Sequence, residues 1–130
     1  MQRLKTQAQF QAVMAGSTVS RTVHFALHRL PLDAPTPAIP SLPHALFAVH
    51  EAWVGTLVPK RWARRAVTRN AIKRQIHAVS LACEPQLPVA AHVVRLRAGF
   101  DRKQFISATS PLLKAAVRAE LQQLFAGARP

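Results

Sequence analysis

The chain has 130 residues, of which 49% are hydrophobic, so it is long enough to bury a core and is not a disordered basic tail. Its 18 lysines and arginines against 5 acidic residues give a net charge of +13, which attracts polyanions such as nucleic acid. One cysteine excludes an internal disulfide framework, and no apolar run approaches the ~20 residues that span a bilayer. We therefore expect one cytoplasmic nucleic-acid-binding domain over residues 1–130, with no membrane partner.

The first predicted element is a short helix near the N-terminus. Thr6 can cap it, with Gln9 reaching back three residues later, and Gly16 provides a stop. One face of this helix carries the apolar side chains Phe10, Val13 and Met14.

Strand character follows on both sides of a proline-rich segment. Residues 21–30 alternate, with Val23, Phe25 and Leu27 on one side, which predicts a half-buried strand. Residues 31–44 contain five of the ten prolines, so we expect a long, stiff surface loop there. Residues 45–58 resume the strand pattern.

A long helix is predicted from about Ala63 to Cys83. One narrow stripe of it is apolar and should pack on the sheet: Ile72, Ile76, Val79 and Cys83. The opposite side carries Arg69, Asn70, Lys73, Arg74 and His77.

The C-terminal part predicts one more strand, residues 92–97, and a closing helix. Ser110 is the expected N-cap of that helix and Pro111 its first residue. Its core stripe is Leu113, Val117, Leu121 and Leu124. The predicted order is therefore helix, strands, basic helix, strand, helix, which is an α+β fold.

The most unusual feature is the basic segment, residues 60–74. It holds seven positive side chains in fifteen positions, and no acidic residue lies between residues 52 and 83. Arginine forks suit phosphate oxygens, while Asn70 either reads a sugar hydroxyl or base edge or ties down a neighbouring group. Since no helix-turn-helix pairing is visible, we favour folded RNA over a DNA major groove as the partner.

The chain offers little for catalysis of its own. Its five acidic residues show no pair for acid–base work or for metal binding. His24 and His28 would lie about 13 Å apart on a strand, which is too far to share a metal. Cys83 falls on the apolar stripe and is read as a core thiol. Any chemistry is therefore expected to belong to a partner.

Two motifs resemble the protein component of bacterial ribonuclease P. One is the Arg-Asn-x-x-Lys-Arg core, Arg69 to Arg74, which follows a strand ending in "VGTLVP" and a Lys-Arg pair; the other is "FQAVMAG", Phe10 to Gly16. The resemblance covers essentially the whole chain. It implies an α/β sandwich with a central mixed sheet, like a ribosomal-protein fold, and a left-handed βαβ crossover where general rules favour a right-handed one.

The resemblance also implies a function. The ribonuclease P ribonucleoprotein is an endoribonuclease that removes the 5′ leader of precursor tRNA, and its RNA subunit binds the catalytic Mg²⁺ and performs the hydrolysis. The protein, one copy per catalytic RNA, would supply neither catalytic residues nor metal ligands. Its implied contacts to the RNA are Lys60, Arg61, Arg64, Arg65, Arg69, Asn70, Lys73 and Arg74. A cleft holding the leader would include Phe10, Met14 and His28.

Two other readings compete with this one. A ribosomal protein or general RNA chaperone of the same fold would bind many RNAs alike. A free-standing metal-dependent nuclease would be active without any RNA partner, and the scarcity of acidic residues argues against it.

Overall fold

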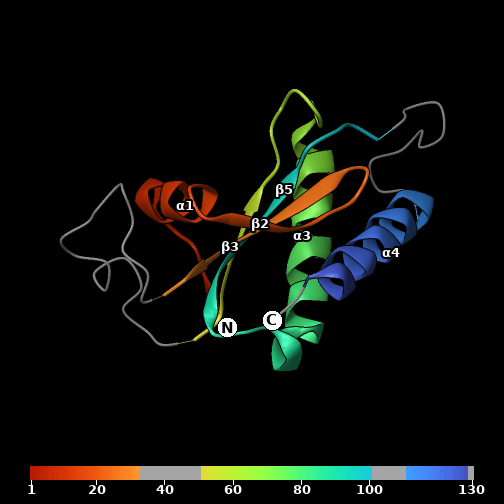
Figure 1. Ribbon diagram of the computed structural model, residues 1–130. Helices are drawn as coiled ribbons and strands as arrows, with labels where there is room; N and C mark the ends of the chain where they lie inside the picture. Colours follow the sequence, from red (N-terminus) through yellow and green to blue (C-terminus); the bar gives the residue numbers. More distant parts are fainter. Residues whose placement is uncertain (33–50, 101–110, 129–130) are drawn as a thin grey trace.

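The computed structural model describes residues 1–32, 51–100 and 111–128. The strands are β1 (Gln2–Arg3), β2 (Ser17–Arg21), β3 (Phe25–Pro31), β4 (Trp53–Leu57) and β5 (Ala90–Leu96). The helices are α1 (Gln7–Met14), α3 (Ala66–Ala82) and α4 (Pro111–Gly127), and a short 3-10 turn, Glu84–Gln86, follows α3. Figure 1 shows these elements as one layered unit, and the predicted α+β class is confirmed.

The sheet is mixed and has the order β1-β4-β5-β3-β2. β1, β4 and β5 run parallel to one another, whereas β3 is antiparallel to both of its neighbours, β5 and β2. The neighbouring parallel strands β4 and β5 are joined through α3, which forms a β-α-β unit. The left-handed crossing of this unit stays a prediction.

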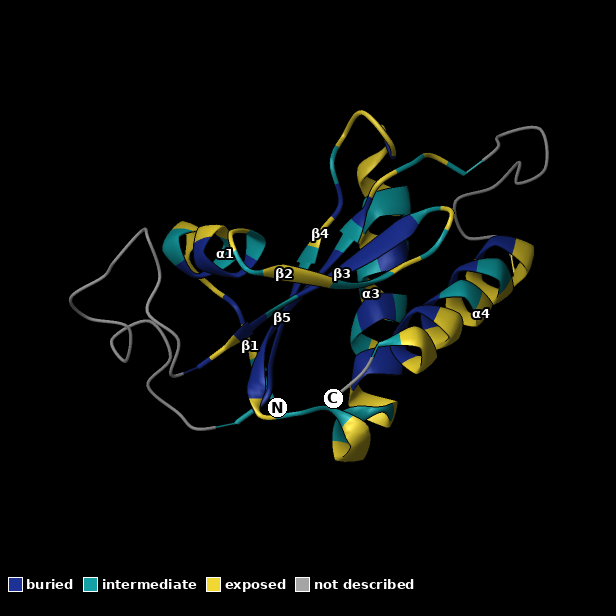
Figure 2. Cartoon of the chain, in the orientation of Figure 1, coloured by how far each residue is buried: buried dark blue, intermediate teal, exposed yellow. Residues whose placement is uncertain are grey.

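The two faces of the sheet carry different helices. On one face, Phe25 and Leu27 of β3 pack against the buried stripes of α3 and α4. On the other face, Ala12 and Val13 of α1 pack against Leu30. Figure 1 shows α1 and the α3–α4 pair on opposite sides of the sheet, and Figure 2 shows the central strands buried.

Several local predictions are confirmed. Thr6 accepts a hydrogen bond from the backbone of Gln9, whose side chain in turn accepts one from the backbone of Thr6, so the capping box is complete. All members of both core stripes are buried except Cys83, which is half-buried against the same core. The expected N-cap Ser110 and residues 33–44 of the proline-rich loop lie outside the described residues.

The strand predicted over residues 21–30 is confirmed from Phe25 onward, but its first part is wrong, because the chain forms a hairpin there. β2 ends at Arg21, and β3 begins at Phe25 and pairs back onto it. The turn between them exposes 73% of Val23, one of the expected core residues. β3 is also not half-buried, because helices cover both of its faces and its first four residues are all buried.

Gly16 follows the end of α1 as predicted, but for a different reason. No glycine among the described residues has a positive φ, so Gly16 is not a left-handed helix stop. A Cβ atom added at Gly16 would lie 2.6 Å from the carbonyl oxygen of Arg29 on β3. The absence of a side chain therefore lets the chain leave α1 in close contact with the sheet.

Candidate nucleic-acid interface

The basic segment is divided between a loop and a helix. α3 begins at Ala66, three residues later than predicted, so the first four cations lie in the loop before it. All four side chains are exposed: Lys60, Arg61, Arg64 and Arg65. Arg65 is the N-cap residue of α3 and provides no side-chain cap, and the first turn holds no acidic residue. The positive end of the helix dipole therefore adds to the charge of these side chains.

Arg69 holds the loop in place. Its side chain is half-buried, and its Nη1 donates to the carbonyl oxygens of Ala63 at 3.1 Å and Arg64 at 2.8 Å. Ala63 is itself buried in the core beneath α3. Arg69 thus has a structural role within the protein, in addition to any contact with RNA.

The outer side of α3 presents the rest of the predicted contacts. Asn70 and Arg74 are exposed and Lys73 is half-buried. The guanidinium of Arg69 donates to backbone carbonyl oxygens and not to the side chain of Asn70. The exposed amide of Asn70 can therefore bind an external partner. One turn later, burial, Arg3 and Lys73 lower the pKa of His77, which leaves this ring neutral at pH 7.

The three residues predicted for a leader cleft lie on the α1 side of the sheet. Phe10 and Met14 of α1 are half-buried against the core on that side. His28 is a buried residue of β3. It pairs with Val93 of β5, which in turn pairs with Gly55 of β4, so the three residues form one row across the sheet. A Cβ atom at Gly55 would lie 2.7 Å from the Phe10 ring, so Gly55 makes room for that ring.

Two arginines that the sequence analysis did not single out join this group. Nε of Arg95 donates to Nε2 of His28 at 3.3 Å, and Nδ1 of His28 lies 3.2 Å from Oγ1 of Thr18. Burial, followed by the charges of Arg95 and Arg21, lowers the pKa of His28. A neutral His28 accepts from Arg95 and donates from Nδ1 to Thr18, which fixes its tautomer.

These residues form what we call the sheet patch: Phe10, Met14, Arg21, His28 and Arg95. It combines two cations with the half-buried Phe10 ring and Met14 thioether around the buried His28, on the side of the sheet opposite α3. The alternation of Val93 and Arg95 in β5 was the signal for Arg95, but a sequence pattern does not locate this side chain until the register of β5 on β3 is known.

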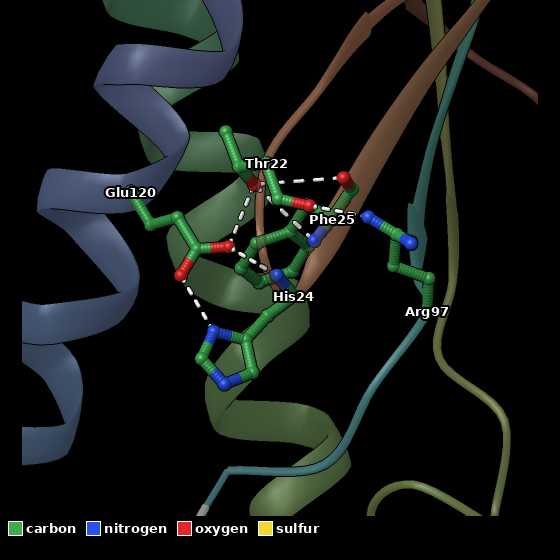
Figure 3. A network of polar contacts seen from close by, with 5 residues as sticks. All are labelled: Thr22, His24, Phe25, Arg97 and Glu120. Carbon is green, nitrogen blue, oxygen red and sulfur yellow. Dashed lines mark hydrogen bonds and ion pairs between the residues drawn. The ribbon is translucent and has the colours of Figure 1, made fainter.

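The acidic residues described are engaged within the protein. Figure 3 shows Glu120 of α4 accepting hydrogen bonds from the hydroxyl of Thr22 at 2.6 Å and the backbone N–H of His24 at 2.7 Å, with the His24 ring also at 2.7 Å. Glu51 and Glu84 both bind the amino group of Met1, at 3.2 and 2.7 Å. The described part of the chain holds no group of three residues suited to a metal ion.

Comparisons with known proteins identify the family of this chain. The family model for Ribonuclease P matches residues 1–124. The chain belongs to the ribonuclease P protein family. The ribonuclease P protein component of Bordetella petrii is 32% identical over 128 residues, covering 98% of this chain and 92% of that protein. The component of Ralstonia pickettii is 33% identical over 124 residues, covering 95% and 76%.

Solved structures of similar proteins share the fold of this chain. The RNase P protein of Staphylococcus aureus has a TM-score of 0.68 at 17% identity, covering 97% of this chain and 94% of that chain. The Thermotoga maritima protein has a TM-score of 0.66 at 15% identity and covers both chains completely. Membership of the family places the chain among the protein components of a tRNA-processing ribonucleoprotein. None of the described helices is long and apolar enough to cross a membrane.

A second arginine–histidine pair lies on the opposite face of the sheet. Nε of Arg29 donates to Nε2 of His92 at 3.0 Å, and Nδ1 of His92 donates to the carbonyl oxygen of Trp53 at 3.1 Å. Burial, followed by the charge of Arg29, lowers the pKa of His92 to about 4. His92 is therefore a neutral hydrogen-bonding link between β3, β4 and β5.

This link predicts a loss of stability in acid. The unfolded chain binds a proton at His92 near pH 6.5, whereas the folded chain does so only near pH 4, so stability is lost as pH falls between these values. At pH 5 the loss is about 2 kcal/mol. Urea unfolding at pH 7.5 and 5 should show this extra loss in the wild type relative to His92→Gln. Equal losses in both proteins would contradict the assignment.

Proposed function

We propose that this protein is the RNA-binding subunit of ribonuclease P, which contacts the catalytic RNA through the basic segment and the 5′ leader of precursor tRNA through the sheet patch. The observation that carries the proposal is the basic segment: seven cations, four of them in one anchored loop, in a chain of the ribonuclease P family. Because Arg69 anchors the loop backbone, the positions from which these cations extend are set before binding, which reduces the entropy cost of association.

The sheet patch fits a single-stranded segment better than a duplex. Arg21 and Arg95 supply charge for a phosphate backbone, while the Phe10 ring and the Met14 thioether can pack against bases. Met14 and the buried His28 offer a base less stacking surface than Phe or Tyr would, so the leader should be held without strong sequence preference. The patch lies on the other side of the sheet from α3, so both RNAs can bind at once.

The chemistry is assigned to the RNA subunit with its Mg²⁺. The described carboxylates do not fit a metal site, since Glu51 and Glu84 bind the N-terminal amine and Glu120 binds the β2–β3 turn. The protein's own contribution is to bind and orient: it neutralises phosphates of the catalytic RNA and holds the leader beside it. One protein copy per catalytic RNA is expected.

Reconstituted cleavage tests this function. We expect the protein to restore removal of the 5′ leader from a precursor tRNA by a bacterial ribonuclease P RNA at low Mg²⁺, where that RNA alone is slow. The protein without RNA should be inactive. Binding without any effect on cleavage would instead indicate a general RNA-binding role, and cleavage by the protein alone would indicate a free-standing nuclease.

The salt dependence of RNA binding tests the basic segment. The side chains of Arg64 and Arg74 are exposed and make no hydrogen bond to another described residue, so Arg64→Ala with Arg74→Ala should leave the fold intact. The slope of log K against log salt should fall in magnitude by about two, one for each phosphate that the variant no longer neutralises. Arg118→Ala on α4 removes a positive charge outside the segment and should leave the slope unchanged. Equal slopes in all three proteins would contradict the interface.

A further inference from the structure

Trp62 is an exposed aromatic residue in the loop between β4 and α3. The side chain of Trp62 is 38% exposed, whereas Trp53, the other tryptophan, is 7% exposed in the core. A single exposed apolar residue is common on protein surfaces, so exposure alone indicates nothing. The anchoring of Trp62 and the charge around it make it unusual.

The backbone at Trp62 is fixed on several sides. Its N–H donates to the carbonyl oxygen of Pro59 at 3.1 Å, and the next residue, Ala63, is buried and donates to the same oxygen. Arg69 holds the carbonyl oxygen of Ala63 from α3. A Cβ atom at Gly99 would lie 3.0 Å from the carbonyl oxygen of Trp62, so the segment after β5 closely approaches this loop.

The surroundings of the indole ring are strongly cationic. Four of the six residues from 60 to 65 are lysine or arginine, and the guanidinium carbon of Arg61 lies 5.2 Å from the ring centroid of Trp62. This distance is typical of a cation–π contact, which holds ring and guanidinium together. A partner for this site must therefore carry negative charge and an apolar, preferably planar, surface.

We propose that Trp62 stacks on an unpaired base of the RNA that binds the basic segment. An unpaired nucleotide offers a flat π surface for the indole and a phosphate for the adjacent cations, and stacking tolerates any base. The anchored backbone reduces the entropy that the contact costs. A second copy of the chain is disfavoured by the repulsion between two proteins of charge +13. The proposal rests on the proposed function, because it takes the ribonuclease P RNA as the partner.

Substitutions at Trp62 distinguish the contribution of stacking to RNA affinity from the contributions of apolar contact and of charge. Trp62→Ala and Trp62→Leu should both weaken binding to a bacterial ribonuclease P RNA by roughly 5- to 150-fold, whereas Trp62→Phe should stay within a few-fold of the wild type. The salt slope should be unchanged in all three, because each keeps every charge of the wild type. Full affinity in Trp62→Leu would overturn stacking, and circular dichroism checks that each variant is folded.

Fluorescence reports on the ring directly, since the chain has two tryptophans and no tyrosine. In Trp53→Phe, Trp62 is the only tryptophan, and stacking on a base should quench its emission as RNA is added. In Trp62→Phe, the buried Trp53 should respond little to the same RNA, which corrects for absorption by the RNA. Binding is followed in parallel by filter retention for both proteins.

The outcomes distinguish this inference from the proposed function. If RNA binds both variants tightly but the emission of Trp62 does not change, the stacking contact is wrong and the subunit function stands. If neither the wild type nor the variants bind the RNA, the proposed function is wrong, and the stacking contact that rests on it is wrong as well. A shift of Trp62 emission with phosphatidylglycerol vesicles, and none with RNA, would overturn the proposal in favour of a lipid surface.

Discussion

The burial of the sheet on both faces is the constraint on which the rest of the structure depends. β3 and β5 lie at its centre, with α1 on one face and α3 and α4 on the other. The chain has 18 basic side chains, and none of them can be buried beneath these helices without a hydrogen-bonding or ionic partner, because an isolated buried charge is very costly. Among the described residues, most cations therefore lie at the ends of the strands, in the connecting loops and on the outer sides of the helices.

The two arginines that remain on the central strands follow the same rule. Arg29 and Arg95 each donate to the Nε2 atom of a histidine on the neighbouring strand, His92 and His28. In both pairs the pKa of the histidine is lowered, so the arginine faces a neutral acceptor rather than a second cation. The pairs are oriented to opposite faces of the sheet, and only the His28–Arg95 pair belongs to the sheet patch.

The loop before α3 concentrates like charges, which repel one another, and the protein holds them by local contacts rather than by acidic neighbours. Arg69 binds two loop carbonyls, Ala63 is buried in the core, and the guanidinium of Arg61 lies over the Trp62 ring. The first turn of α3 adds no counter-charge. Phosphates arriving from outside would therefore meet a surface whose repulsion they relieve, and this is the physical basis of the proposed RNA contact.

Much of this architecture could be predicted from local patterns. The capping box at Thr6 and the stripes of α3 and α4 depend on spacing within one element, and spacing is visible in sequence. The β2–β3 hairpin was not found, because the turn Thr22–His24 contains no glycine, proline or asparagine and is held by Glu120, almost a hundred residues away. Arg21 and Arg95 were missed from the site for the same reason, since only long-range strand pairing brings them to His28.

We propose that opposite sides of the sheet contact different RNAs, and directed hydroxyl-radical cleavage in the reconstituted complex measures which RNA lies beside each side. In a Cys83→Ser background, an iron chelate is attached to Ala78→Cys on the exposed side of α3 or to Gln11→Cys on the exposed side of α1. We expect cuts in the ribonuclease P RNA from α3 and cuts in the 5′ leader of the precursor tRNA from α1. The same cuts from both positions, or none in the leader from α1, would contradict it.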